Sequence, residues 1–352
     1  MMMTSRERVL TACRRGRPDR VPRQFPMLGE VHALIRTELG IDNPHAWLGD
    51  DCDWVGWKAS WQATDFRHYF DRPDMEWDEW GRGRVWDAQR HYAEYFYPLQ
   101  DEESLEAIGA YPWPDLDQSY RFEHCSASVA ASHDRDRPVV AGMQETIFEI
   151  AWQVRSMERL FTDMVFAPEL AAAVLDPITS LRVAAARHLA AAGADILSLG
   201  DDVAMQTGLL MSKATWRQWL GPRLKAVIDA AKAVKPDILI HYHSDGAITD
   251  LIPDLIEAGV EILNPMQPEC VDHAWVKQHY GDRLAFWGGL GVQSVLPFGT
   301  PEQVRTHVKE VLADLGADGG LVIAPSHVLE TDTPVANIVA MREAIEECGG
   351  YD

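Results

Sequence analysis

The sequence lacks an apolar run long enough to cross a membrane. A helix needs about 20 apolar residues in a row to span a bilayer, and no run in this 352-residue chain approaches that length. The N-terminal stretch MMMTSRERVLTACRRGRPDR also lacks the apolar core of about 7–15 residues that a secretory signal requires. We therefore expect a cytoplasmic protein with no membrane partner.

Cysteine is scarce and scattered. The five cysteines stand at positions 13, 52, 125, 270 and 348, and no CxxC pair occurs. An odd number of widely spaced cysteines argues against a disulfide framework, and the missing CxxC pairs argue against a cysteine-rich zinc module. Neither class of small cross-linked domain is therefore expected.

Positive charge is in deficit. The chain has 32 Lys and Arg against 54 Asp and Glu, which gives a formal net charge of −22 at pH 7. Such a surface repels the phosphate backbone of nucleic acids, so we expect no nucleic-acid partner. With 47% hydrophobic and 24% charged residues, the composition is otherwise that of a globular protein.

The C-terminal two-thirds alternates between strand-like and helix-like segments. Helix-period stretches separate the apolar runs, and one of them has Thr300 as its expected N-cap and Pro301 in its first turn. Strands buried on both faces of a parallel sheet read as continuous runs of Val, Ile and Leu, as these do. The apolar runs of strand length lie at 138–145, 194–202, 237–245, 260–269, 284–291 and 320–327.

Polar residues end nearly every one of these runs. An open doubly wound sheet would gather its functional groups at one switch point, and the GxGxxG of a dinucleotide-binding sheet is absent after the early strands. A barrel builds its site from the carboxyl ends of several strands. We therefore predict an α/β protein with a single (β/α)8 TIM barrel spanning residues 1–352. The polar residues at the run ends are Glu145, Asp201, Asp202, His243, Asp245, Asn264, Gln267, Ser326 and His327.

The first third of the chain has a different character. From about residue 28 to 130 it is dense in Trp, Asp and Pro, as in DCDWVGWKASWQATDF. VPRQFPML, which starts at Val21, fits a first strand, but two further barrel strands cannot be assigned here. We expect residues about 30–130 to form an irregular Trp-rich cap or insert whose tryptophans pack rather than stack on ligands. Whether it closes over a ligand or forms an interface stays open.

The segment HYHSD, from His241 to Asp245, has the spacing of a metal site. Residues two apart share a face of a strand, so His243 and Asp245 would point the same way at the rim and grip one divalent cation. His241 lies deeper and is expected to be a core residue bonded to a neighbouring strand. The alternative is a hydrogen-bonded pair that caps the following helix through Ser244 or Asp245.

His327 ends the last clear strand. If the HYHSD strand and this one are the sixth and eighth of a barrel, both rims border the central mouth, and His243, Asp245 and His327 can surround one cation with a position left for water or substrate. Without a metal, His327 and Asp245 remain acid–base partners near neutral pH.

Further polar groups near strand ends have two interpretations each. Asp201 and Asp202 point apart on a strand, so one would orient a ligand while the other caps the next segment; Gln206 follows them. Glu145 is either functional or a first-turn residue that stabilises its helix, because helix N-termini carry partial positive charge. Whether Glu149 or Cys270 joins the site is left open, since a single cysteine is usually buried and inert.

Four segments together are similar to the uroporphyrinogen decarboxylase superfamily. They are TSRERVLTACRRGRPDRVP, HSDGAITDLIPDLIEAGVEILNPMQPE, FWGGLGVQSVLPFGTPEQVRTHV and GGLVIAPSHVLETDTPVANIVAM. The likeness covers nearly the whole chain and is weakest over about residues 30–130. DEWG, YPWPDLD and GDDVAMQTGLLMS further resemble the branch of corrinoid-dependent methyltransferases. The resemblance implies a (β/α)8 barrel.

The resemblance implies two competing activities. Decarboxylases of this group bind the porphyrinogen carboxylates with a pair of arginines near the first strand; here that region keeps Arg23 alone and has Glu30 nearby. The methyltransferases bind zinc through His-x-Cys after one strand and Cys after the last. At the matching positions stand His243, Asp245 and His327, so both cysteines are replaced by other competent ligands.

We therefore expect a metal-dependent methyltransferase, with zinc or a similar divalent ion at His243, Asp245 and His327. This harder ligand set suits an oxygen-bearing substrate such as a methoxy compound, whose methyl group would pass to a corrinoid on a partner protein. The alternatives are a decarboxylase and a diverged metal-free enzyme on the same scaffold. The methyl donor is not identified, and a homodimer stays open. The expected catalytic residues are Asp202, Glu145 and His327, and the expected substrate-binding residues are Asp201, Gln206, Asn264 and Arg23.

Overall fold

The computed structural model describes residues 2–62, 64–70, 72, 74–87 and 93–351. Its centre is a curled sheet of seven parallel strands in the order β1-β5-β6-β9-β10-β11-β12. The strands are β1 (Asp53–Val55), β5 (Val139–Met143), β6 (Ile196–Gly200), β9 (Leu239–His243), β10 (Ile262–Asn264), β11 (Ala285–Leu290) and β12 (Leu321–Pro325). The six strands predicted for the C-terminal two-thirds are confirmed.

An extended segment near Arg23 closes the sheet into a ring. The amide of Gln24 donates to the carbonyl of Ile323 in β12 at 3.1 Å, and the amide of Asp51, just before β1, donates to the carbonyl of Arg23 at 3.0 Å. The segment therefore takes the place of the first strand, as predicted, and the (β/α)8 barrel is confirmed. In this count β9 is the fifth strand rather than the sixth, because β1 is the second.

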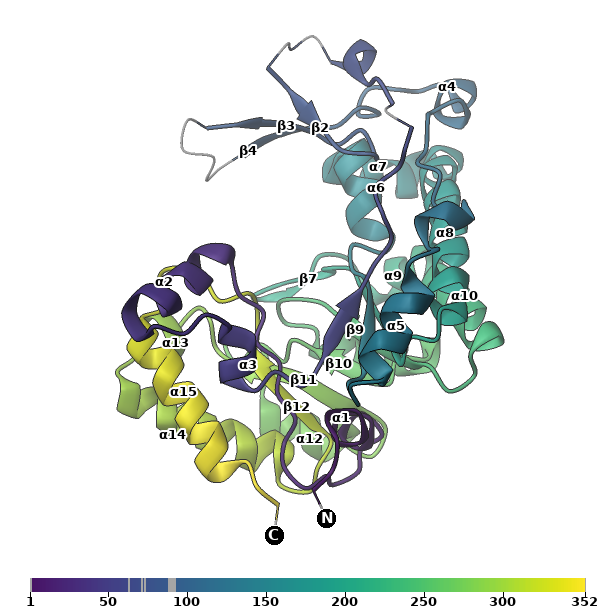
Figure 1. Ribbon diagram of the computed structural model, residues 1–352. Coiled ribbons are helices and arrows are strands. Elements are labelled where there is room, and N and C mark those ends of the chain that lie inside the picture. The colour runs from purple at the N-terminus through teal and green to yellow at the C-terminus, as the bar shows by residue number, and fades with distance from the viewer. Residues whose placement is uncertain (1, 63, 71, 73, 88–92, 352) are drawn as a thin grey trace.

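Helices cover the outside of the barrel (Figure 1). In α14, Thr300 is the N-cap, as predicted, and it also forms a capping box with Gln303. No described helix is long and apolar enough to cross a membrane. The covering helices are α5 (Cys125–His133), α8 (Pro168–Ala191), α9 (Lys213–Trp219), α10 (Gly221–Val234), α11 (Ile252–Ala258), α12 (His273–Tyr280), α13 (Val295–Phe298), α14 (Pro301–Val311) and α15 (Val335–Cys348), with helical turns at Thr249–Leu251 and Leu312–Gly316.

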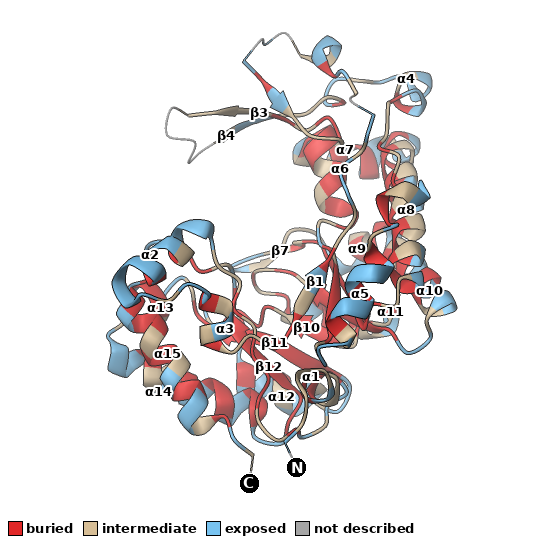
Figure 2. Cartoon of the chain, in the orientation of Figure 1, coloured by how far each residue is buried: buried red, intermediate tan, exposed pale blue. Residues whose placement is uncertain are grey.

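Helix α1 (Ser5–Cys13) closes the amino-terminal end of the barrel, near both chain termini (Figure 1). Val9, Ala12 and Cys13 join a fully apolar cluster with inward residues of the strands, among them Val140 and Val322. Outward residues of the same strands pack against the helices in a second, larger cluster. Figure 2 shows the strands as mostly buried and the outer faces of α2 and α5 as exposed.

The region of residues about 30–130 is not a single irregular insert, so that prediction is not confirmed in the form given. Its first part belongs to the barrel: α2 (Gly29–Leu39) and α3 (Pro44–Leu48) lie beside α15 (Figure 1), and β1 is a barrel strand. The later part stands above the carboxyl ends of the strands (Figure 1). It holds the antiparallel sheet β2 (Glu76–Trp77), β3 (Gly83–Trp86) and β4 (Ala93–Phe96), with α4 (Leu105–Gly109) and turns at Arg67–Tyr69 and Ser119–Arg121.

Helices α6 (Phe148–Arg155) and α7 (Met157–Phe166) connect this upper part to the barrel (Figure 1). Arg82, next to β3, forms an ion pair with Glu145 at 2.8 Å. The guanidinium of Arg182, fully buried in α8, lies over the rings of Trp57 and Trp80 at 5.1 and 5.0 Å. These two tryptophans therefore serve packing, as expected for the region.

Candidate metal and substrate site

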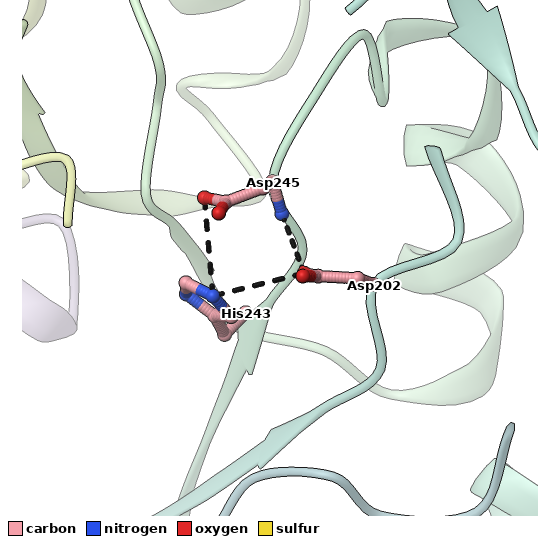
Figure 3. Close-up of side chains that lie close together, drawn as sticks. All are labelled: Asp202, His243 and Asp245. Atoms are coloured by element: carbon pink, nitrogen blue, oxygen red, sulfur yellow. Dashed lines mark hydrogen bonds and ion pairs between the residues drawn. The ribbon is translucent and has the colours of Figure 1, made fainter. Parts of the chain in front are cut away.

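Three side chains converge at the carboxyl ends of β6 and β9. His243 is the last residue of β9, Asp245 lies two residues beyond it, and Asp202 lies two residues beyond β6. One ligand atom from each lies within 4.8 Å of the others, and Figure 3 shows the three side chains pointing toward one another. Nε2 of His243 lies 3.7 Å from Oδ1 of Asp202 and 3.9 Å from Oδ1 of Asp245.

The ring of His243 is held in place from its other side. Its Nδ1 lies 2.5 Å from Oδ1 of Asn264, while the amide nitrogen of Asn264 donates to the carbonyl of Trp287 at 3.0 Å. Because the amide oxygen of Asn264 can only accept, Nδ1 of His243 carries a proton, and Nε2 is the ring nitrogen that faces the two aspartates and that a metal could take. A partner of this kind is typical of histidines that ligate metals.

Burial and mutual repulsion raise the free energy of the ionised carboxylates in this region. The pKa of Asp245 is raised, first by burial and then by the charge of Asp202, while His243 and His327 act to lower it. The pKa of Glu149 is raised by burial and by Asp201 and Asp202. A divalent cation among these carboxylates would relieve that cost.

The group of Asp202, His243 and Asp245 fits a divalent metal ion. Two carboxylate oxygens and one imidazole nitrogen are ligands that zinc and related ions accept, and three protein ligands leave a position for substrate. A backbone contact also holds the group together, because the amide of Asp245 donates a hydrogen bond to Oδ1 of Asp202 at 2.8 Å. Asp202, predicted as a catalytic residue, thus lies where a metal ligand would.

His327 stands apart from this group. Along β12, Val322, Ala324 and Ser326 point into the barrel, and residues two apart share a face. His327 therefore turns toward the rim, where it is exposed, and it is not among the three residues whose ligand atoms lie within 4.8 Å. The predicted trio of His243, Asp245 and His327 becomes Asp202, His243 and Asp245, with His327 on the wall of the adjoining space.

Two hollows meet at Ser326, His327 and Val328. The inner cavity, of about 520 Å³, lies inside the barrel mouth and reaches His241, His243 and Asn264. The rim cavity, of about 470 Å³, lies beside Asp245, Gln267, Gln293 and Phe298. His243 faces the inner cavity and Asp245 the rim cavity, so the cluster lies between two spaces that small molecules can enter.

Asp201 supports the backbone of a helix and is not among the described residues that line the inner cavity. It is 5% exposed, and its carboxylate accepts the backbone amides of Ile147 and Glu149 at 3.0 Å. It therefore caps the first turn of α6, which has no cap from its own side chains. The predicted substrate contact from Asp201 is not found among the described residues that line the inner cavity.

Glu145 and Glu149 lie behind the cluster. Glu145 is engaged by Arg82 at 2.8 Å and by Gln153 at 3.4 Å, and these contacts link the upper sheet to the barrel. Glu149 accepts the amide of Asp202 at 3.2 Å, so it fixes the loop that carries this residue. Neither glutamate is among the described residues that line the two cavities.

The other predicted contacts fall in different places. Asn264 lines the inner cavity but its side chain is occupied by His243 and Trp287. Gln206 is exposed and donates to Gln293 at 2.6 Å, on the wall of the rim cavity. It belongs to the loop that holds β7 (Ala204–Met205) and β8 (Gly208–Leu209).

Arg23 points away from the barrel mouth. Its guanidinium lies beside Gly49 and 3.6 Å from Glu346 in α15, and it is 7% exposed. The neighbouring Gln24 lines the inner cavity instead. Arg23 is therefore not among the described residues that line the inner cavity, because the alternation of the segment directs its side chain outward.

His241 is a core residue bonded to a neighbouring strand, as predicted. Its Nδ1 lies 3.0 Å from Oγ of Ser198 in β6, and its ring meets Trp287 edge-on. Burial lowers the pKa of His241 to about 3, so the ring is neutral. Cys270 lies after β10, and its thiol pKa is raised by burial and by Glu269 and Asp245, which keeps it in the less reactive thiol form.

Sequence reasoning missed Gln24, Trp54 and Gln144, all of which line the inner cavity. For Gln24 and Trp54 the available signal was the period-2 alternation of the first two strands, but a three-residue strand such as β1 offers too few positions to establish its phase. Ser326 was noted as a strand-end residue without a role, although it lies two residues after inward-facing Ala324.

The chain matches the family described as uroporphyrinogen decarboxylase (URO-D) over residues 98–348. A methylcobamide:CoM methyltransferase of Methanosarcina barkeri is 27% identical over 213 residues, which cover 60% of this chain and 59% of that protein. A methylated-thiol–coenzyme M methyltransferase of Methanosarcina mazei is 27% identical over 242 residues, which cover 67% and 61%. A uroporphyrinogen decarboxylase of Coxiella burnetii is 24% identical over 184 residues, which cover 51% and 48%.

The match thus spans about three-fifths of the length of the two methyltransferases. A solved structure of a methyltransferase from Methanosarcina mazei superposes with a TM-score of 0.70 at 21% identity, and it covers 98% of this chain and 99% of that one. The two chains therefore share one fold over nearly their whole lengths.

Proposed function

The chain belongs to the uroporphyrinogen decarboxylase (URO-D) family, and from that premise we propose that it is a metal-dependent methyltransferase. It would move a methyl group from a small oxygen-bearing compound to a corrinoid carried by a partner protein. Two relatives with methyl-transfer names, one of them a methylcobamide enzyme, support the reaction class.

One observation carries the proposal: the convergence of Asp202, His243 and Asp245 between two cavities, with Nδ1 of His243 fixed by Asn264. In the proposed role, the lone pair of Nε2 and one oxygen of each carboxylate hold the metal. A divalent ion there would supply Lewis acidity toward a substrate oxygen. Asn264 keeps the imidazole in the ligating tautomer, and Glu149 keeps Asp202 in place through the backbone.

His327 would handle protons at the cavity wall. Its ring is exposed at the junction of the two cavities, and an imidazole can exchange a proton with a leaving or entering oxygen near neutral pH. In the metal-free alternative, His327 and Asp245 would serve as the acid–base pair. Asp201 and Glu145 are assigned to supporting the fold around the site rather than to substrate.

Porphyrinogen decarboxylation is less well supported by the cavity. A substrate with many carboxylates requires Arg or Lys nearby, and the described residues that line the inner cavity include neither. Arg23, the one arginine kept from the family pattern near the first strand, pairs with Glu346 outside the barrel.

Metal analysis of the purified full chain tests the proposal. We expect stoichiometric divalent metal in the wild type, its loss in His243→Ala, and its retention in His279→Ala, which removes an exposed histidine of α12. Transfer of a labelled methyl group from a methoxy compound to reduced cobalamin should follow the metal content. Equal metal in His243→Ala and wild type would overturn the ligand assignment. Consumption of uroporphyrinogen without methyl transfer would establish the decarboxylase instead.

A further inference from the structure

The walls of the inner cavity are formed mostly by aromatic, amide and apolar side chains. Its floor is formed by inward side chains of neighbouring strands: His241 bonded to Ser198, Asn264 bonded to Trp287, and Gln24, whose Oε1 accepts from the indole of Trp287 at 3.4 Å. Among the described residues that line it there is no Lys, Arg, Asp or Glu. An ionic group on a ligand would therefore lose its hydration there without gaining an ion pair to Lys, Arg, Asp or Glu.

The size of the cavity sets a lower limit on its ligand. At about 520 Å³ it falls within the range of sites that enclose whole organic molecules. A one- or two-carbon alcohol would leave most of the apolar wall in contact with water. The wall therefore fits a compound with a larger apolar body.

Trp54 offers a flat surface to such a body. It is 45% exposed, although it lies on the inward face of β1, with Val55 turned to the outer core. Within the described part of the chain no aromatic ring stacks on its indole, and its six-membered ring lies near Gly142, which has no side chain to cover it. An uncovered indole in a cavity wall gains most by stacking on a planar ring.

Ser326 provides one orphan polar group. The residue is 2% exposed, and its Oγ has no hydrogen-bond partner among the described residues. Leaving a buried hydroxyl without a partner is costly, and this hydroxyl belongs to a residue that lines the inner cavity two positions beyond inward-facing Ala324. A ligand oxygen placed there would accept its hydrogen bond.

From these four features we infer that the inner cavity binds an uncharged aryl methyl ether, with its ring on Trp54 and its ether oxygen accepting from Ser326. The inference rests on the proposed methyl transfer from an oxygen-bearing compound and names the class of that compound. Ser326 is a positioning residue: it sets where the methoxy oxygen lies relative to Nε2 of His243, which faces the same cavity.

Direct binding measurements test this without turnover. Titration calorimetry on the full chain would compare four methoxy probes: neutral 2-methoxyphenol, anionic 4-methoxybenzoate, cationic 4-methoxybenzyltrimethylammonium and saturated methoxycyclohexane. We expect 2-methoxyphenol to bind at least about tenfold more tightly than the anion, the cation and the saturated ring. Tighter binding of the carboxylate, the ammonium or the saturated ring would overturn the inference.

Variants separate the two contacts. Ser326→Ala should weaken 2-methoxyphenol about 5- to 10-fold and leave 2-ethylphenol, which lacks the ether oxygen, unchanged. Trp54→Ala should weaken both. The control is Ser132→Ala, which removes a buried serine that bonds to Asp53 outside the inner cavity. Equal affinity of wild type and Ser326→Ala for the ether would refute the role of the hydroxyl.

Metal content, measured on the same samples, distinguishes this failure from failure of the proposed function. Ser326→Ala and Trp54→Ala should keep the metal of the wild type. Selective binding of the ether by a chain without metal would leave the cavity assignment standing and remove the metal site. A chain that holds metal but does not bind the ether would keep the metal site and refute the cavity assignment.

Discussion

Carboxylates at the two ends of the barrel have pKa values shifted in opposite directions. At the amino-terminal end, Asp195 accepts from Arg6, from His133 and from the amide of Val139; burial raises its pKa, but these bonds outweigh burial and hold the pKa below its usual value. Asp19 bonds to Arg8, and its pKa falls to about 2. Every one of these charges has a fixed partner.

At the carboxyl end the balance is reversed. Burial raises the pKa of Asp245 and of Glu149, and the neighbouring carboxylates raise it further. In the described part of the chain, the ion-pair partner of both Asp202 and Asp245 is His243. Two carboxylates that share one imidazole are incompletely neutralised, which costs stability, and such groups gather where a ligand is to be bound. One end of the barrel therefore stabilises the fold, and the other gives up stability for a site.

Replacing Asp245 should have the largest effect on the difference between the two ends of the barrel. In Asp245→Asn we expect metal affinity and methyl transfer to fall by more than about 100-fold. Because the folded-state pKa of Asp245 is raised, its ionised form is penalised above the usual carboxyl range. The metal-free variant should therefore unfold at higher denaturant concentration than metal-free wild type at pH 7. A metal-free variant that is less stable would contradict the comparison.

Removing the support of His243 should have a smaller effect. In Asn264→Ala the imidazole loses the acceptor that fixes its tautomer, and the loss of such a partner weakens metal binding by about 10- to 100-fold. Competition with a chromogenic chelator would measure this. If the asparagine acts through the histidine, Asn264→Ala should cause no further loss of metal affinity when it is added to His243→Ala.

At the amino-terminal end, Asp195→Asn should destabilise the protein by about 2 kcal/mol at pH 7, since hydrogen bonds to a charged group are lost. A depressed folded-state pKa means that the stabilisation is present above the unfolded value and disappears as the pH falls through the folded value. Urea unfolding of both proteins from pH 7 down to pH 3 should show the difference shrinking. Metal content should match wild type.

The mildest change is Val9→Ala in the helix that closes the barrel. Val9 is fully buried in the apolar cluster, and loss of two methyl groups should cost about 1–2 kcal/mol. Metal affinity should stay the same, since the two ends are separated by the layers of side chains inside the barrel. Loss of metal in this variant would mean that the closure and the site are coupled.

The strands could be predicted because buried parallel strands are apolar on both faces. The polar residues that follow each apolar run therefore marked where each strand ends. His243 and Asp245 were placed together correctly because a separation of two needs no tertiary information. His327 was predicted at the rim of the barrel mouth, where it does line both cavities, but its ring is not among the three groups that lie within 4.8 Å of one another. Polarity alone does not reveal which of two adjacent strand-end residues, Ser326 or His327, turns inward.

Tertiary contacts decided the rest. Asp201 and Asp202 are adjacent and equally polar, yet one caps α6 and the other reaches His243, because only the first lies under the free amides of Ile147 and Glu149. In the first third, β1 is too short to show a period, and its pairing with β5 along Asp53–Val55 supplies what its sequence does not. Such a strand is specified by its neighbours.

Gln24, His45 and Trp54 lie between the inner cavity and a third hollow of about 560 Å³ on the flank of β1, since all three line both. Shortening these side chains would bring the two spaces closer to one another, while Asp202, His243 and Asp245 stay untouched. The size of the space for a ligand can therefore change where the first two strands meet without any change in the group of Asp202, His243 and Asp245.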